Sequence, residues 1–190
     1  MTTLITGATG FIGRRLISAV NGEIRVLSRA KHSDFETVIC NLQSDVISDN
    51  ALDGIDTVFH LAGFSHDLRD ASRISDLYYK VNVNATVQLA NLAVKSGVKR
   101  LVFVSSVKAG GIPPLAICAN EKDQRNAEDV YGQTKREAEL KLLEIGQVSD
   151  MHVSIIRSSL VYGPDVKGNL QLMLSGIEKG WFPPLPETAN

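Results

Sequence analysis

Three glycines near the start of the chain constrain its fold more than any other feature. Gly7, Gly10 and Gly13 are spaced by three residues. They follow the short apolar run Leu4–Thr6 and lead into an amphipathic segment, which predicts a strand, a tight turn and the start of a helix. In that setting glycines allow positive φ, a close approach of the backbone to a pyrophosphate, and tight packing of helix on strand. The turn therefore predicts a dinucleotide site at a helix N-terminus; a glycine turn that binds nothing is the alternative.

The composition is that of an ordinary globular chain. Its 190 residues suffice for one domain, with 44% hydrophobic and 22% charged residues. A net charge of −1 gives no electrostatic basis for binding nucleic acid or an acidic membrane surface. Cys40 and Cys118 are its two cysteines and fit neither a metal-ligand spacing nor a disulfide framework, so no metal site and a cytoplasmic location are expected. No run approaches the roughly 18 apolar residues that span a bilayer.

Apolar strands alternate with amphipathic helices along the whole chain. Strands are expected over residues 3–6, 23–27, 37–40, 56–63, 100–105 and 153–157. Helices are expected over residues 11–20, 70–96, 131–145 and 169–179, with a helical turn at 51–54 and a loop over 112–129. The pattern predicts an α/β fold, a doubly wound parallel sheet of the Rossmann type. Its ligand is expected at the carboxyl ends of the strands.

A tyrosine and a lysine four residues apart open the expected helix over 131–145. Tyr131 and Lys135 share one helix face, so the ammonium can favour the phenolate and lower the pKa of the tyrosine. Ser106, at the end of the preceding strand, can offer a hydroxyl to the same substrate oxygen. Together these groups can exchange a proton with an alcohol or ketone while a nicotinamide carries the hydride. An exposed amphipathic helix start is the alternative explanation of the tyrosine and lysine.

The chain resembles an extended short-chain dehydrogenase/reductase of the NAD-dependent epimerase/dehydratase family. Five segments carry the resemblance, in family order: Thr6-Gly7-Ala8-Thr9-Gly10-Phe11-Ile12-Gly13, Val58-Phe59-His60-Leu61-Ala62-Gly63, Val102-Phe103-Val104-Ser105-Ser106, Tyr131-Gly132-Gln133-Thr134-Lys135, and Arg157 with Val161-Tyr162-Gly163-Pro164. The run over 161–169 is similar to a bacterial surface-polysaccharide branch that contains UDP-hexose 4-epimerases and 4-ketoreductases.

The resemblance implies a role for each matching residue. Ser106, Tyr131 and Lys135 would be catalytic, with Tyr131 as the acid/base. The cofactor would contact the turn, the end of the fourth strand, the end of the third strand and the lysine, through Gly7, Thr9, Gly10, Phe11, Ile12, Gly13, Leu61, Ala62, Gly63, Asn41, Leu42 and Lys135. Asn41 departs from the aspartate that the family usually has there. Asn169 would contact the substrate diphosphate. His60 is interpreted as a packed strand residue.

Two departures narrow the expected chemistry. Dehydratases of this family follow the catalytic threonine with Asp-Glu, whereas this chain has Val107 and Lys108, which argues against dehydration. The second strand ends in Ser28-Arg29, where NAD enzymes usually place a carboxylate for the ribose 2′-hydroxyl. Arg29, with Arg14, can pair with a 2′-phosphate, so the cofactor is NAD or NADP with a slight preference for NADP. Two solvated arginines are the alternative.

These inferences predict an NAD(P)-dependent enzyme that acts on a nucleotide-linked hexose. A nucleotide-sugar 4-epimerase is the first hypothesis; an NADPH-dependent 4-ketoreductase and a non-catalytic dinucleotide-binding module are the alternatives. The expected domains are a Rossmann domain over 1–165 and the start of a substrate-binding region over 166–190, since family members continue well past this length into a smaller carboxyl-terminal domain. By analogy with relatives, a homodimer through the helices over 70–96 and 131–145 is expected.

Overall fold

The computed structural model describes residues 1–65, 74–114, 118–122, 124–166 and 168–181. They belong to two compact units, Met1–Ser159 and Leu160–Asn190, which are described separately. The division lies close to the expected boundary at residues 165 and 166, and that assignment stays a prediction. Among the described residues, no helix is long and apolar enough to cross a membrane, and no group of three or more His, Cys, Asp or Glu side chains is arranged to hold a metal ion.

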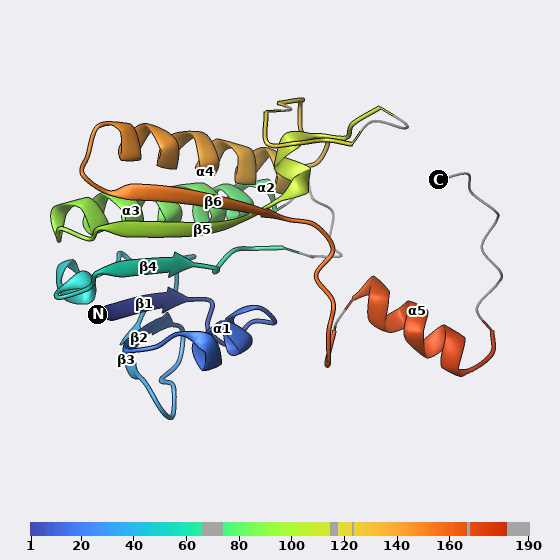
Figure 1. The fold of residues 1–190 in the computed structure, drawn as a ribbon, viewed down its shortest axis with the longest axis horizontal. Helices are drawn as coiled ribbons and strands as arrows, with labels where there is room; N and C mark the ends of the chain where they lie inside the picture. Colours follow the sequence, from blue (N-terminus) through green and yellow to red (C-terminus); the bar gives the residue numbers. More distant parts are fainter. Residues whose placement is uncertain (66–73, 115–117, 123, 167, 182–190) are drawn as a thin grey trace. The chain divides into compact units, whose positions relative to one another are not determined.

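The first unit is built on a parallel sheet of six strands (Figure 1). They are β1 (Thr2–Thr6), β2 (Glu23–Ser28), β3 (Glu36–Ile39), β4 (Thr57–His60), β5 (Arg100–Ser106) and β6 (His152–Ser158). The order across the sheet is β3-β2-β1-β4-β5-β6. Strands β2 and β3 are added on one side of β1 and strands β4 to β6 on the other, so the order of strand addition switches between β1 and β4. Doubly wound sheets bind ligands at this switch point, beyond the carboxyl ends of the strands. The expected α/β Rossmann-type fold is confirmed.

Helices cover both faces of the sheet because successive strand residues point to opposite sides. Leu4 of β1 joins a core with residues of α3 (Ala85–Lys95) and α4 (Val130–Gln147), which lie over one face (Figure 1). Its neighbour Ile5 packs on the other face with Leu16 of α1 (Gly13–Ala19). Both residues are fully buried, which fixes β1 and the turn that follows it at the centre of the unit.

The long helix expected over 70–96 is divided by a wider turn. Its described part comprises α2 (Ser75–Tyr78), the π-helical turn η3 (Tyr79–Asn84) and α3, while residues 70–73 lie outside the described residues. A π turn adds one residue to the helical repeat and often marks a functional site. Here it carries the buried Asn82.

The other elements follow the expected pattern with small shifts at their ends. Helix α1 begins at Gly13, two residues later than expected, since residues 7–12 form the turn. The described residues include two 3-10 turns: η1 (Asp49–Leu52) near the expected helical turn, and η4 (Val107–Gly110), which was not expected. In the second unit, α5 spans Asn169–Glu178. The irregular tail expected at 181–186 lies outside the described residues beyond Trp181.

Candidate active site

The glycine turn after β1 is shaped by contacts that only glycine permits. Gly7 has a φ of +70°, and a Cβ there would lie 2.7 Å from the backbone nitrogen of Ala62. A Cβ on Gly13 would lie 2.2 Å from the carbonyl oxygen of Gly7, so the helix start is packed directly on the turn. The N–H of Gly10 donates to that same oxygen at 2.9 Å. The turn thus brings the N-terminus of α1 close to the ends of β1 and β4, as a phosphate cradle requires.

A cavity of about 420 Å³ lies at this switch point. It is lined by the glycine turn, the ends of β2 and β3, and the segment after β4, through Gly7, Thr9, Gly10, Leu27, Ser28, Arg29, Cys40, Asn41, Leu42, Gln43, Leu61, Ala62, Gly63, Phe64, Ser65 and Val81. Nine of the proposed cofactor residues therefore share one cavity: Gly7, Thr9, Gly10, Arg29, Asn41, Leu42, Leu61, Ala62 and Gly63. Its glycine floor and its position fit a dinucleotide.

Four proposed cofactor residues do not line this cavity. Gly13 lies buried beneath the turn, and Phe11 packs its ring under the guanidinium of Arg15, 4.1 Å from the ring centroid. Ile12 forms the N-cap of α1. Lys135 adjoins the cavity, since a Cβ on Gly63 would lie 3.3 Å from its Nζ. The roles of these residues toward a cofactor stay predictions.

The end of the cavity formed by β2 and β3 contains no carboxylate among its described lining residues. Ser28 donates its hydroxyl to the carbonyl of Ala30, and the exposed Arg29 lies beside it. Asn41 accepts the N–H of Gln43 on Oδ1 at 3.2 Å, which fixes its side chain at the start of a turn. None of the described lining residues therefore offers a carboxylate to a ribose 2′-hydroxyl.

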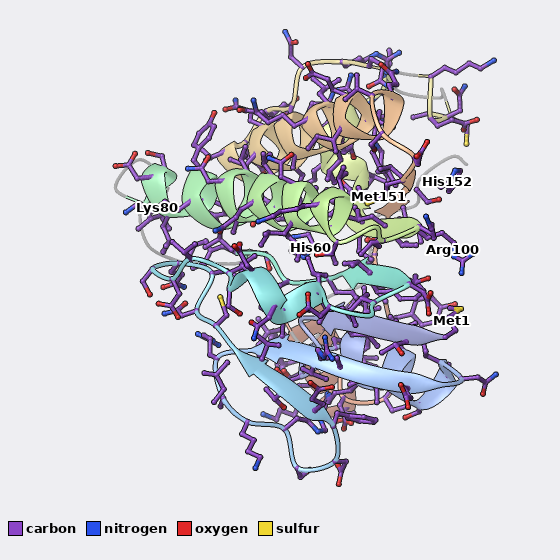
Figure 2. The ribbon with its side chains drawn as sticks, turned by 90° about the vertical axis from the view of Figure 1, so that its left-hand side faces the viewer. Met1, His60, Lys80, Arg100, Met151 and His152 are labelled. Atoms are coloured by element: carbon purple, nitrogen blue, oxygen red, sulfur yellow. The ribbon has the colours of Figure 1, made fainter. Side chains whose placement is uncertain are left out.

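His60, the last residue of β4, is fully buried and holds the end of the strand in place (Figure 2). Its Nδ1 lies 2.7 Å from Oγ1 of Thr6 and its Nε2 lies 2.8 Å from Oγ1 of Thr86, so it joins β1 to α3. The N–H of Ala62 donates to the same Thr6 oxygen at 3.1 Å. Burial, with a smaller contribution from the Lys135 charge, lowers the pKa of His60 to about 3. The ring is neutral and holds the backbone that lines the cavity.

Tyr131 and Ser106 meet where α4 begins beside the end of β5. Ser106 is the serine that lies close enough to the Tyr131 phenol to lower its pKa, while Ser105 is buried. Burial raises the pKa of Tyr131, the nearby Ser106 hydroxyl lowers it, and the charges of Asp129 and Tyr78 raise it; the net pKa lies above the ordinary value. The lowered tyrosine pKa expected from the sequence is therefore not present in this structure.

Lys135 lies one turn further along α4 and is almost completely buried. Its Nζ donates to the carbonyl oxygen of Val104 at 2.9 Å and lies 4.3 Å from the centroid of the Phe103 ring. Burial lowers the pKa of Lys135 to about 8, and the charge of Glu139 opposes that shift. The lysine is thus held by β5 beside the cavity, and its burial favours the loss of its proton.

Asn82 is a structural residue of the site that the sequence reasoning missed. Its Oδ1 accepts the N–H of Phe64 at 2.7 Å, and its Nδ2 donates to the Phe64 carbonyl and to Oγ1 of Thr134. It therefore joins the segment after β4 to the helix of Tyr131. Its signal in the sequence is weak, an asparagine between two valines in a helical stretch that also contains Lys80 and Asn84.

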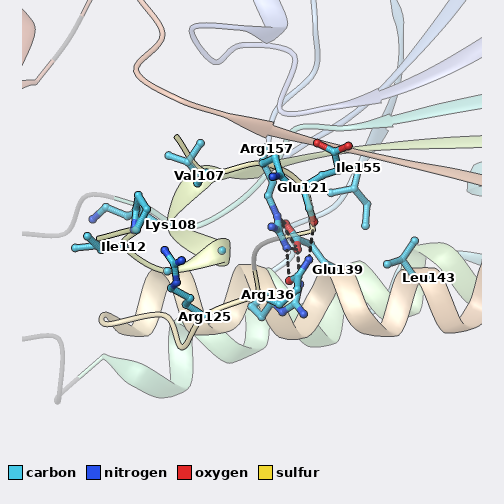
Figure 3. Close-up of a pocket in the computed structure, with 16 residues that line it drawn as sticks. Val107, Lys108, Ile112, Glu121, Arg125, Arg136, Glu139, Leu143, Ile155 and Arg157 are labelled. Carbon is cyan, nitrogen blue, oxygen red and sulfur yellow. Dashed lines mark hydrogen bonds and ion pairs between the residues drawn. The ribbon is translucent and has the colours of Figure 1, made fainter. Parts of the chain in front are cut away.

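A larger cavity of about 760 Å³ lies beside η4, between α4 and β6 (Figure 3). Arg157 of β6 forms a bidentate ion pair with Glu139 of α4, with contacts between 2.6 and 3.1 Å. Arg136 adds a contact of 3.5 Å to the same carboxylate. Dashed lines in Figure 3 mark these pairs, which join the helix of the acid/base candidates to the edge of the sheet.

Asn169, the expected substrate contact, begins α5 in the second unit. Its side chain lies outside the described part of the chain. The role proposed for it stays a prediction.

A doubly wound sheet with a glycine cradle at its switch point, and with a serine, a tyrosine and a lysine beside it, defines a dinucleotide-binding α/β protein of the short-chain dehydrogenase/reductase type. Residues 3–181 match the model of the NAD dependent epimerase/dehydratase family. The chain belongs to that family, and the resemblance inferred from its motifs is confirmed.

Two curated relatives are similar over nearly the whole chain. A UDP-glucose 4-epimerase of Vibrio cholerae is 36% identical over 195 residues, covering 96% of this chain and 58% of the relative. An N-acetyl-alpha-D-glucosaminyl-diphospho-ditrans,octacis-undecaprenol 4-epimerase of Escherichia coli O157:H7 is 31% identical, covering 94% of this chain and 54% of the relative. The chain thus spans little more than half the length of these proteins.

A solved structure shares the fold. MoeE5 in complex with UDP-glucuronic acid and NAD superposes with a TM-score of 0.82 at 27% identity, covering 93% of this chain and 61% of that chain.

Proposed function

We propose that the chain is the cofactor-binding and catalytic part of a nucleotide-sugar 4-epimerase. The observation that carries the proposal is the meeting of Ser106 and Tyr131 beside the cavity that Lys135 adjoins. The similarity to two 4-epimerases supports C4 of a hexose as the reacting position. The missing Asp-Glu pair after Ser106, where Val107 and Lys108 stand, disfavours dehydration.

Tyr131 is the proposed acid/base. Its phenolate takes the proton of the C4 hydroxyl as the sugar is oxidised and returns it when the 4-keto sugar is reduced on its other face. Ser106 donates its hydroxyl to the same oxygen and orients it. When bound, the nicotinamide ring supplies a hydride acceptor and donor.

Lys135 has two proposed tasks: to hold the nicotinamide ribose and to favour the phenolate of Tyr131. The raised pKa of Tyr131 reflects its burial in this structure. A positive charge near the phenol, such as that of an oxidised nicotinamide, would shift the equilibrium toward phenolate. The proton is therefore lost from Tyr131 most readily when the oxidising form of the cofactor is bound.

For the cofactor itself we propose NAD, with NADP as the alternative. The MoeE5 complex contains NAD, and the comparisons give no support to the preference for NADP drawn from Arg29. Two observations favour NADP, and with it the 4-ketoreductase alternative: the described cavity lining contains no carboxylate, and it includes Arg29. Mass spectrometry of the nucleotide that co-purifies with the protein distinguishes the two.

The test of the function is exchange at C4 in the full-length protein. UDP-glucose and UDP-N-acetylhexosamines are incubated with it, and the 4-epimers are measured. Tyr131→Phe removes the phenolic oxygen and is expected to lower the rate roughly 100-fold or more. Tyr79→Phe is the matched control, because Tyr79 is 38% exposed on η3, and its rate is expected to stay unchanged.

Two outcomes would replace the epimerase with an alternative. Consumption of NADPH with a 4-keto sugar, without exchange at C4, would establish the ketoreductase. Unchanged activity in Tyr131→Phe would leave a module that binds dinucleotide without Tyr131 chemistry.

A further inference from the structure

The 3-10 turn η4 and the first turn of α4 are joined by a chain of polar contacts. Ser106 caps η4, since its Oγ accepts the N–H of Lys108 at 3.3 Å. The ammonium of Lys108 forms an ion pair of 2.6 Å with Oδ2 of Asp129. The other oxygen of Asp129 accepts the N–H of Gly132 at 2.7 Å and so caps α4. The two ends of this chain of contacts are Ser106 and the turn that carries Tyr131.

Backbone contact brings the same two elements together. A Cβ built on Gly132 would lie 2.7 Å from the carbonyl oxygen of Lys108, so α4 approaches η4 at a distance that only glycine allows. Gly111 makes a similar approach on the other side of η4, because a Cβ there would lie 2.7 Å from the carbonyl of Asn126. The N–H of Arg125 donates to the carbonyl of Gly110 at 3.0 Å. The backbone of η4 is therefore held on both sides, which fixes the position from which the Lys108 side chain extends.

We propose that Lys108 and Asp129 form a charge clamp, which positions the first turn of α4, and with it the phenol of Tyr131, against the Ser106 turn. Both are positioning residues that act through Tyr131. The proposal rests on the proposed function only in giving Tyr131 an acid/base role; the clamp itself is defined by the contacts of η4 and α4.

The clamp also controls the charge that acts on the phenol, because Lys108 offsets the carboxylate of Asp129. Burial raises the pKa of Asp129, but hydrogen bonds from Lys108 and the Gly132 N–H, with the Lys108 charge, more than offset this, so Asp129 is ionised. An ionised Asp129 raises the pKa of Tyr131. Lys108 offsets that negative charge at 2.6 Å. The groups that act on the phenol from the packed elements are Asp129 at the N-cap of α4, Ser106 of β5 and Tyr78 of α2, and Lys108 of η4 acts through Asp129.

The clamp predicts opposite effects for its two members. Lys108→Met leaves the Asp129 carboxylate without its partner, so the pKa of Tyr131 is expected to rise by roughly 0.3 to 0.7 pH unit, the size typical of a partly exposed charge pair. Asp129→Asn keeps an oxygen that can cap α4 and removes the charge, so the pKa is expected to fall by a similar amount. In the double variant, Lys108→Met adds little to Asp129→Asn.

The experiment is a titration of tyrosine labelled with carbon-13 at Cζ, followed by NMR between about pH 8 and 12. It uses the full-length protein, and Tyr131→Phe assigns the signal. Lys95→Met is the matched control, since the exposed Lys95–Asp49 pair of 3.3 Å lies at the end of α3 that leads into β5. It is expected to leave the Tyr131 titration unchanged. Circular dichroism at each pH confirms that the variants remain folded.

The pH dependence of C4 exchange provides a second measurement, in which the acid limb is expected to move in the same directions. Shifts of Tyr131 in one direction for both single variants, or no shift in either, would overturn the clamp. If Tyr131 titrates as expected but Tyr131→Phe retains full exchange, the proposed function fails and the clamp stands.

Discussion

His60 has a structural role, since its two ring nitrogens make hydrogen bonds inside the fold. It is fully buried, contacts Thr6 and Thr86 through its two ring nitrogens, and stacks on Phe103 with ring centroids 5.6 Å apart. A charged imidazole would have to be desolvated near Lys135, which is why the pKa of His60 falls to about 3. The ring thus holds the cavity backbone only in its neutral form.

The protein is therefore expected to become less stable as the pH falls, because His60 is protonated only in the unfolded chain. In the unfolded chain the pKa is near 6.5, so between that value and about 3 the unfolded state binds a proton that the folded state does not. The stabilisation is complete above about pH 6.5 and is lost as the pH falls. The linkage relation gives a loss of about 2 kcal/mol between pH 7 and pH 5.

Urea unfolding of the wild type and of His60→Gln at these two pH values measures the loss. The variant lacks the titrating ring. Its free energy of unfolding is expected to change between pH 7 and pH 5 by about 2 kcal/mol less than that of the wild type. NMR of the His60 ring gives an independent measurement, because its signals are expected to stay unchanged down to about pH 4. A His60 ring that titrates near its ordinary pKa would disprove the account.

At the scale of elements, α4 is bonded to β6 by the buried pair Glu139–Arg157. The Glu139 side chain is 2% exposed and that of Arg157 is 17% exposed, and the hydrogen bonds that Arg157 donates to Glu139 are the main cause of its raised pKa. Removal of one partner from such a pair leaves an uncompensated charge in the interior, which destabilises a fold by about 3–5 kcal/mol.

Glu139→Gln is accordingly expected to destabilise the protein by about 3 kcal/mol, which lowers Tm by roughly 6 °C or more. Glu137→Gln on the same helix is the matched control. Its contact with Lys141 is 3.9 Å long, both side chains are at least 40% exposed, and the expected change is below about 0.5 kcal/mol. Calorimetry of the two variants compares them directly. Equal melting temperatures would show that the pair contributes little.

The sequence predicts most elements because their signals are local, and it misses features that depend on distant partners. Apolar runs and glycines located β1, its turn and the sheet, since burial on both faces leaves continuous hydrophobic strands. The π turn η3 was missed because one extra residue does not disturb a helical pattern over a long segment. The Glu139–Arg157 pair joins residues 18 apart on different elements.

The candidate site shows the same division. The proximity of Ser106 to Tyr131 was expected from the ends of β5 and α4, and the structure places Ser106 close enough to lower the pKa of the phenol. The rise in the pKa of Tyr131 was not expected. The four-residue spacing to Lys135 indicates a nearby positive charge, but the sequence does not show how deeply the phenol is buried. Asn82 and the contact of Lys108 with Asp129 also require the folded arrangement, which no local pattern encodes.

At the scale of the whole molecule, helices α3 and α4 present a surface that one copy of the described chain leaves open. Leu140 of α4 is 50% exposed and Val94 of α3 is 37% exposed. A hollow of about 580 Å³ lies beside them, lined by α3 residues such as Val87 and by Lys141. An apolar, hollowed surface of two neighbouring helices suits a second copy related by a twofold axis.

We therefore predict a homodimer through α3 and α4. Light scattering at micromolar concentration is expected to give about twice the chain mass of 20.6 kDa for the wild type. Leu140→Lys places two charges against each other across a twofold axis and is expected to give the mass of one chain. Ile39→Lys, at a 66% exposed position on β3, is the matched control and is expected to remain dimeric. A wild type of single-chain mass, or a dimer that survives Leu140→Lys, would show that these helices do not form the interface.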